Sequence, residues 1–219
     1  MFKNSKPVIA IDGTAGSGKG TLAKNLSKKL NFDHLDTGLL YRIYAYESKQ
    51  SKVVKKVFDI DLNKFFNDKT KLKKLRSEEI SKIASQISKR KEVRKSLINF
   101  QRNFANNPPR GIGSVIDGRD IGTIIIPNAE VKFFVDAKVE IRASRRISQL
   151  NLDDSEYEIT LKNMKRRDIR DSTRKISPLI RAKDSYNIDT SKLHENEVLK
   201  IALDFIKKKQ ILISNCISS

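Results

Sequence analysis

The sequence of 219 residues contains one cysteine, Cys216, and no tryptophan. A lone cysteine cannot form a disulfide within the chain, which excludes a disulfide-stapled secreted scaffold and favours a reducing compartment. The longest apolar runs, at 124–127 and 131–135, are far too short to span a bilayer. The lysines near the N-terminus are not followed by the hydrophobic region of a signal peptide. We therefore expect a soluble, cytoplasmic protein with no membrane partner.

Acidic residues are scarce relative to basic ones, because 26 Asp and Glu face 45 Lys and Arg and leave a formal net charge of +19. Either the protein binds a polyanion, such as nucleic acid or a phosphorylated small molecule, or the lysines decorate solvated faces. The lysines are scattered through 49–95 and the C-terminal helix, whereas the arginines concentrate in 142–146 and 166–181. Because arginine binds phosphate in a bidentate manner, we expect function in the second arginine cluster.

Apolar runs and helical periodicities alternate along the chain. Buried strands are expected at 8–12, 113–117, 131–136 and 186–190, with a weaker one at 33–36. Helices are expected at 21–30, at 37–46 with Thr37 as N-cap, at 139–150 and around 198–205. This alternation predicts an α/β fold with a mostly parallel, doubly wound β-sheet flanked by helices.

Residues 49–107 differ from the rest because they contain no glycine, are rich in lysine and show helical periodicity. The Pro108-Pro109 pair then breaks the helical pattern. We interpret 49–111 as a helical insertion within one domain that spans 1–219. The core of that domain is expected in 1–48, 112–165 and 184–219, and an arginine-rich lid in 166–183.

A glycine-rich stretch follows the first expected strand and opens the first expected helix. It comprises Gly13, Thr14, Ala15, Gly16, Ser17, Gly18, Lys19, Gly20 and Thr21. Four residues separate Gly13 from Gly18-Lys19, which is the spacing of a loop whose backbone N–H groups and lysine hold the phosphates of a nucleoside triphosphate. Gly20 stands where the strict pattern has Ser or Thr. The Gly-Lys-Gly-Thr version is common in small-molecule nucleotide kinases, so we expect ATP to bind here.

The second arginine cluster lies between an expected helix and the last strand. Arg167, Arg170 or Asp171, and Arg174 are three to four residues apart and can share one helix face. A flap bearing these arginines could exclude water and neutralise a transferring phosphoryl group. The alternative is a solvated basic helix. No guanine-reading Asn-Lys-x-Asp stretch is present, which argues against a GTPase.

Six motifs in order along the chain carry a resemblance to a known family. They are Ile11-Asp12-Gly13 through Thr21; Leu35-Asp36-Thr37-Gly38 with Tyr41-Arg42; Ala84-Ser85-Gln86 with Val93-Arg94; Asp117-Gly118-Arg119-Asp120-Ile121-Gly122-Thr123; Arg167-Asp168 through Arg174; and Ser177-Pro178-Leu179. With them the chain resembles the bacterial cytidylate kinases, within the nucleoside monophosphate kinases of the P-loop fold. The resemblance implies transfer of the ATP γ-phosphoryl group to CMP or dCMP with Mg²⁺, by a monomer that acts on small molecules and not on nucleic acid.

The resemblance also implies roles for individual residues. Lys19, Arg167 and Arg174 match catalytic positions. Positions that hold the acceptor phosphate are matched by Thr37, Tyr41, Arg42, Arg119 and Arg174. Arg167 and Asp171 match positions at the acceptor ribose, and Asp117 has a Walker-B-like position from which it would hold Mg²⁺ through water, near Gly20 and Thr21.

Ser85, Arg94 and Asp120 match positions that read the cytosine ring. A carboxylate can accept from the exocyclic amine of cytosine, while arginine and serine donate to its ring acceptors. Uracil reverses the pattern at positions 3 and 4 and would leave buried polar groups unpaired. The bland alternatives are an Asp120 that only pairs with Arg119, and ordinary helix or surface roles for Tyr41, Ser85 and Arg94.

Two other functions stay open at this point. One is the same chemistry on another acceptor, such as UMP or AMP, and the other is a nucleic-acid-binding protein with an incidental phosphate loop. The segment between Tyr41 and Ser85 is shorter than in many bacterial relatives, so base discrimination could be looser. His34 and His194 show no metal-ligand spacing and are interpreted as ordinary residues.

Overall fold

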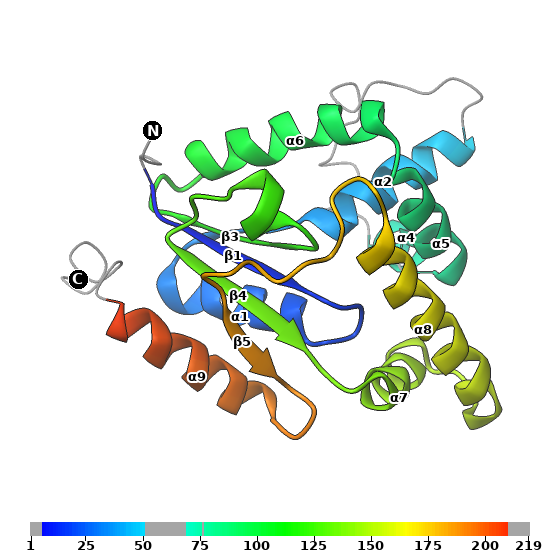
Figure 1. Cartoon of the computed structure of the whole chain (residues 1–219). Helices are drawn as coiled ribbons and strands as arrows, with labels where there is room; N and C mark the ends of the chain where they lie inside the picture. Colours follow the sequence, from blue (N-terminus) through cyan, green and yellow to red (C-terminus); the bar gives the residue numbers. More distant parts are fainter. Residues whose placement is uncertain (1–5, 51–68, 76, 210–219) are drawn as a thin grey trace. The chain divides into compact units, whose positions relative to one another are not determined.

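The computed structural model describes residues 6–50, 69–75 and 77–209 (Figure 1). The chain divides into two compact units. The first comprises Met1–Leu35 and Phe104–Ser219, and the second Asp36–Asn103. Each unit is described by itself.

The first unit is built on a five-stranded sheet with the order β2-β3-β1-β4-β5. The strands are β1 (Val8–Gly13), β2 (Asp33–Asp36), β3 (Ser114–Gly118), β4 (Val131–Asp136) and β5 (Tyr186–Asp189). β1 pairs in parallel with β3 and β4, and β4 pairs in parallel with β5. All six residues of β1 are buried, as expected for the central strand of a parallel sheet that is covered on both faces.

Helices and shorter turns connect these strands (Figure 1). The helices are α1 (Lys19–Leu30), α7 (Val139–Leu150), α8 (Tyr157–Thr173) and α9 (Glu195–Lys208), with the short η2 (Ile121–Ile125) and η3 (Asp154–Glu156). α1 and α9 pack against each other and share one hydrophobic core with the sheet. Phe32 and Phe133 are the largest fully buried side chains of that core. η2 contacts β1 and β3.

In the described residues beyond Asp36, the second unit consists of helices and short turns. Its helices are α2 (Thr37–Gln50), α4 (Lys69–Leu75), α5 (Glu78–Ile87) and α6 (Lys91–Asn106), the last of which continues beyond the unit. α2 packs against α5 and α4. α5 is capped by Ser77, whose side chain accepts a hydrogen bond from the backbone N–H of Ile80.

The predicted α/β fold with its parallel sheet is confirmed, and each predicted strand lies within one or two residues of an observed one. One cap prediction was wrong. Thr37 is the first residue of α2, and the carboxylate of Asp36 caps the helix by accepting from the backbone N–H of Leu39 at 2.9 Å. Part of the predicted insertion, 51–68, lies outside the described residues, so the domain boundaries stay predictions.

Parallel strands bring their carboxyl ends to one edge of the sheet, which is where open α/β sheets bind ligands. At this edge the chain leaves β1 at Gly13, β3 at Gly118, β4 at Asp136 and β5 at Asp189. Within the described parts of the chain, no helix combines the length and the apolar character that a membrane span requires.

Candidate active site

The phosphate loop, residues 13–21, runs from the end of β1 into the first turn of α1. A Cβ atom on Gly13 would lie 1.9 Å from the carbonyl oxygen of Val135, so no side chain fits there. Gly18 is the N-cap of α1 and lies in the left-handed region, at φ 85°. It has no side chain that could accept a hydrogen bond from the free backbone N–H groups of the first turn. The first turn of α1 also has no acidic residue. Its backbone N–H groups therefore suit an anionic ligand.

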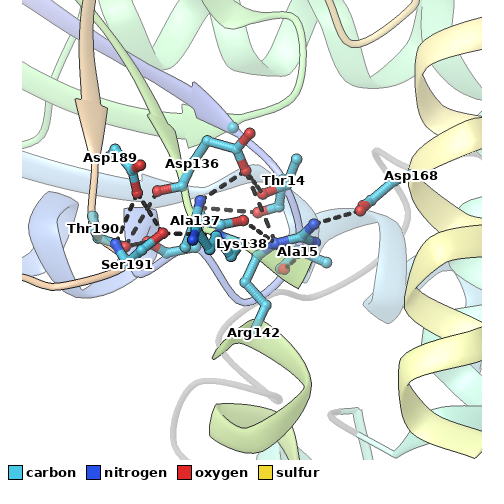
Figure 2. Close-up of polar contacts among 12 residues, drawn as sticks. Thr14, Ala15, Asp136, Ala137, Lys138, Arg142, Asp168, Asp189, Thr190 and Ser191 are labelled. Atoms are coloured by element: carbon cyan, nitrogen blue, oxygen red, sulfur yellow. Dashed lines mark hydrogen bonds and ion pairs between the residues drawn. The ribbon is translucent and has the colours of Figure 1, made fainter. Parts of the chain in front are cut away.

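Carbonyl oxygens of the phosphate loop accept hydrogen bonds from side chains that lie far away in the sequence. The donors are Arg119 to Gly13 at 2.8 Å, Arg142 to Ala15 at 3.2 Å and Thr190 to Ser17 at 2.9 Å. Figure 2 shows Thr14 donating its hydroxyl hydrogen to the carboxylate of Asp136. These bonds hold polar groups of the loop from outside the loop itself.

Lys19 is the first residue of α1, and its ammonium group donates to the carbonyl oxygen of Thr14 at 3.5 Å. The side chain therefore bends back over the loop. This places a positive charge above the turn whose amides suit phosphate.

Asp117, near the end of β3, is buried, and one of its carboxylate oxygens lies 2.8 Å from Nε2 of His34 on β2. Its other oxygen would lie 3.9 Å from a Cβ atom placed on Gly20. The carboxylate thus faces the start of α1, where the motif predicts a Mg²⁺ ion near Gly20 and Thr21. In the described parts of the chain, no three His, Cys, Asp or Glu side chains form a metal cage.

Asp12, the fifth of the six buried residues of β1, holds the turn that follows β3. Its two carboxylate oxygens accept from the backbone N–H groups of Ile121 and Gly122, both at 2.8 Å. Burial is the largest influence on this group and outweighs the two hydrogen bonds, raising its pKa to about 7. Asp12 thereby fixes the backbone directly after Arg119 and Asp120.

Five of the predicted acceptor residues lie in the first unit and form a charged group, here called the arginine cluster. Its members are Arg119, Asp120, Arg167, Asp171 and Arg174. Arg119 Nε lies 3.1 Å and Arg167 Nε 3.7 Å from the carboxylate of Asp171, and Arg174 Nη2 lies 3.9 Å from that of Asp120. Burial disfavours the charge on Asp171, but the three arginines outweigh it and hold its pKa below the ordinary value.

The other five predicted acceptor residues lie in the second unit. Thr37, Tyr41 and Arg42 are on α2, Ser85 is on α5 and Arg94 is on α6. Arg94 is buried and donates to the hydroxyl of Tyr41 at 3.2 Å, and its guanidinium lies 3.5 Å from the carbonyl oxygen of Ser88. The hydroxyl of Ser88 in turn donates to the carbonyl oxygen of Ser85 at 2.9 Å. Arg94 is thus bonded to Tyr41 directly and connected to the backbone of Ser85 through Ser88.

Arg42 and Thr37 lie at the N-terminal end of α2. The guanidinium of Arg42 is 3.9 Å from the carboxylate of Asp36, and Thr37 is buried. A Cβ atom on Gly38 would lie 3.1 Å from that same carboxylate and 3.5 Å from Arg42, so glycine suits the close packing of this pair.

Sequence reasoning missed several residues that shape the site. They are Asp12, His34, Asp136, Arg142 and Thr190. A signal was present for Arg142, which opens the arginine-rich stretch 142–146. No local pattern marks the others, because each acts on a partner more than 80 residues away in the sequence.

A hollow of about 290 Å³ lies at the carboxyl ends of β4 and β5. It is lined by Asp136, Ala137, Lys138, Asn187 and Asp189. Asp136, which lines this hollow, also accepts the hydrogen bond from Thr14 of the phosphate loop, and that contact is drawn in Figure 2.

The chain is similar to known proteins in fold and in sequence. A solved structure of an uncharacterised protein from Eubacterium ventriosum is similar in fold, with a TM-score of 0.55 over 92% of this chain and 99% of that one, at 17% sequence identity. The cytidylate kinase of Paramagnetospirillum magneticum is 41% identical over 93% of this chain and 99% of its own length. That of Rhodospirillum rubrum is 40% identical over 92% of this chain and 98% of its own. Residues 9–208 match the family described as cytidylate kinase, and the chain belongs to that family.

Proposed function

We propose that the protein transfers the γ-phosphoryl group of ATP to CMP or dCMP and releases ADP and CDP or dCDP. One observation carries the proposal within this family. Arg119, assigned to the acceptor phosphate, donates to the Gly13 carbonyl of the phosphate loop and also pairs with Asp171 of the arginine cluster. A single side chain thus joins the group suited to ATP to the group suited to the acceptor.

The donor phosphates are assigned to the phosphate loop. The amides at the start of α1 and the ammonium group of Lys19 would hold the β- and γ-phosphates. Asp117 would hold Mg²⁺ through water near Gly20 and Thr21, and a bound Mg²⁺ ion neutralises charge on the transferring group. The hollow beside Asp136 is a candidate place for the nucleoside of ATP.

The acceptor phosphate is assigned to hydroxyl and guanidinium groups, which suit a dianion. They belong to Thr37, Tyr41, Arg42, Arg119 and Arg174. Arg167 and Asp171 are assigned to the ribose, where a carboxylate can accept from a sugar hydroxyl. In the structure the arginines of the cluster already neutralise Asp171, so a substrate phosphate would enter a region of positive potential.

The cytosine ring is assigned to Ser85, Arg94 and Asp120, all of which are buried. Asp120 would accept from the exocyclic amine, while Arg94 and Ser85 would donate to the ring nitrogen and the carbonyl oxygen. Uracil has a carbonyl group where cytosine has the amine. The carbonyl oxygen of uracil and the carboxylate of Asp120 would then be two hydrogen-bond acceptors facing each other. An unpaired buried polar group of this kind costs about 1–3 kcal/mol.

The chemical step needs no covalent intermediate with the protein. An oxygen of the CMP phosphate attacks the γ-phosphorus of ATP, and the bond from that phosphorus to the oxygen bridging to the β-phosphate breaks as ADP leaves. Arg167, Arg174 and Lys19 would neutralise the charge on the transferring group. We further propose that the protein acts as a monomer on cytoplasmic nucleotides.

The test is direct detection of CDP. Purified protein is incubated with ATP, Mg²⁺ and CMP, the nucleotides are separated by chromatography, and CDP and ADP are expected in equal amounts. The matched control is Lys19→Ala, which leaves the backbone of the loop in place. Folded wild-type protein that binds ATP and forms no CDP would overturn the proposal.

A further inference from the structure

Arg142 is a buried cation of α7 that joins three parts of the first unit. Its side chain is 5% exposed. Nε donates to the carbonyl oxygen of Ala137 at 2.8 Å, Nη1 to that of Ala15 at 3.2 Å, and Nη2 to the carboxylate of Asp168 at 2.6 Å (Figure 2). The rigid fork of a guanidinium suits this arrangement, because one planar group serves three acceptors at fixed angles. The phosphate loop and α8 are thereby bonded to the same side chain.

The phosphate loop also packs directly on the two helices that this side chain joins. A Cβ atom on Gly16 would lie 3.2 Å from the methyl carbon of Met164 on α8 and 3.3 Å from Cβ of Arg142 on α7. α7 and α8 also contact each other. A side chain at Gly16 would crowd both helices, so the loop is in close contact with them at this point.

α8 has a second acidic anchor three residues further on. Asp168 bonds to Arg142 on the side of the phosphate loop, whereas Asp171 bonds to Arg119 of the arginine cluster. Because residues three apart lie on adjoining parts of one helix face, the two carboxylates tie α8 to both groups. Arg167, next to Asp168, belongs to that cluster, and so does Arg174 at the end of the helix.

We propose that Arg142 and Asp168 are positioning residues that transmit occupancy of the phosphate loop by ATP to α8. ATP on the loop, acting through the Ala15 carbonyl, Arg142 and Asp168, sets the helix so that Arg167, Asp171 and Arg174 bind the acceptor more tightly. This inference rests on the proposed function, since it assumes that ATP and CMP are the two ligands. The inference is that a coupling free energy exists between the ATP site and the CMP site. Arg142 and Asp168 would contribute to it by positioning α8 and not by contacting a substrate.

The test measures the affinity for CMP with and without a non-hydrolysable ATP analogue. The full chain is titrated with CMP by calorimetry, first alone and then saturated with the analogue and Mg²⁺. For the wild type we expect the analogue to tighten CMP binding on the order of tenfold. In Asp168→Asn this ratio should fall close to one, while the affinity for CMP alone stays near that of the wild type. Arg142→Lys, which keeps the charge and loses the fork, should behave in the same way.

Two further variants distinguish coupling between ATP and CMP binding from a purely structural role of Arg142 and Asp168. Glu158→Gln removes one negative charge from an exposed position of the same helix and should keep the wild-type ratio. The double variant of Arg142→Lys and Asp168→Asn should lose no more coupling than either single variant, because both act in one connection. A ratio retained in Asp168→Asn, or a wild type in which the two ligands bind independently, would overturn the inference. Wild-type protein that forms no CDP would instead overturn the proposed function.

Discussion

The phosphate loop and the arginine cluster lie at the same edge of the sheet but are built from different parts of the chain. The loop is shaped by its backbone, with glycine at Gly13 where a side chain would meet Val135 and with carbonyl oxygens held by Arg119, Arg142 and Thr190. The arginine cluster is shaped by charged side chains that hold one another through Asp171 and Asp120. The backbone amides of the loop remain when one side chain is removed. In the ion-pair network, removal of one side chain takes away a charge and also leaves its partner charge without that contact.

This difference predicts that the cluster is more sensitive to single substitutions than the loop. The largest effect is expected for Arg174→Ala. This substitution removes a positive charge that would neutralise the transferring phosphoryl group, and it also removes a cation beside Asp120. We expect turnover with CMP to fall on the order of 10³-fold. Steady-state kinetics measure this, with thermal unfolding as the control for folding. Turnover near that of the wild type would remove Arg174 from the site.

Lys19→Ala tests the loop side of the same comparison. The amides at the start of α1 still hold the donor phosphates in this variant, so the loss should be smaller, on the order of 10²-fold in turnover. The affinity for ATP should weaken while that for CMP alone stays unchanged. A loss of turnover much greater than that of Arg174→Ala would contradict the proposal that the loop binds phosphate mainly through its backbone amides.

Asp120→Asn sharpens the comparison within the cluster. An amide can donate to the carbonyl of uracil as well as accept, so the variant should lose discrimination between CMP and UMP by roughly 10-fold. The ratio of kcat/KM for the two acceptors measures the effect and is insensitive to a general loss of activity. An unchanged ratio would assign Asp120 to pairing with its arginines instead of to the base.

Asp12→Asn is expected to have the smallest effect and concerns the backbone that carries the cluster. The pKa of Asp12 is raised in the folded protein, from 3.8 to about 7, so the folded state binds the extra proton between those values. Unfolding free energy should therefore fall as pH rises through this window, by roughly 1 kcal/mol per pH unit from this group. Denaturant unfolding from pH 4.5 to 7.5 should show a shallower fall in Asp12→Asn. The amide also leaves one backbone N–H without an acceptor, which lowers the variant at every pH and does not alter the slope.

The same contrast explains what could be predicted from the sequence. The parallel sheet and the phosphate loop follow local rules, namely buried runs of β1 and β4 and glycines at fixed spacing, and both were predicted. The roles of His34 and Asp12 could not be, since their partners Asp117 and Ile121 lie 83 and 109 residues away. Only the folded sheet brings such pairs together.

The arginine-rich stretches illustrate a second limit. Composition marked both 142–146 and 166–181, and we expected function only in the second, yet Arg142 is the residue that bonds the phosphate loop to α8. Arginines at helical spacing look alike in a sequence, whether they face solvent or a buried carbonyl. The distinction depends on which face of α7 packs against α8, and that is decided by tertiary contacts.

The measurement that tests the central claim most directly is release of ADP from ATP and Mg²⁺ across a panel of acceptors. The panel comprises CMP, dCMP, UMP, AMP, GMP and dTMP, each assayed over a range of concentrations with the full chain. We predict strong turnover confined to CMP and dCMP. Comparable turnover with UMP would contradict the assignment of Ser85, Arg94 and Asp120 to the cytosine ring, and silence with every acceptor from folded, ATP-binding protein would contradict the kinase reaction itself.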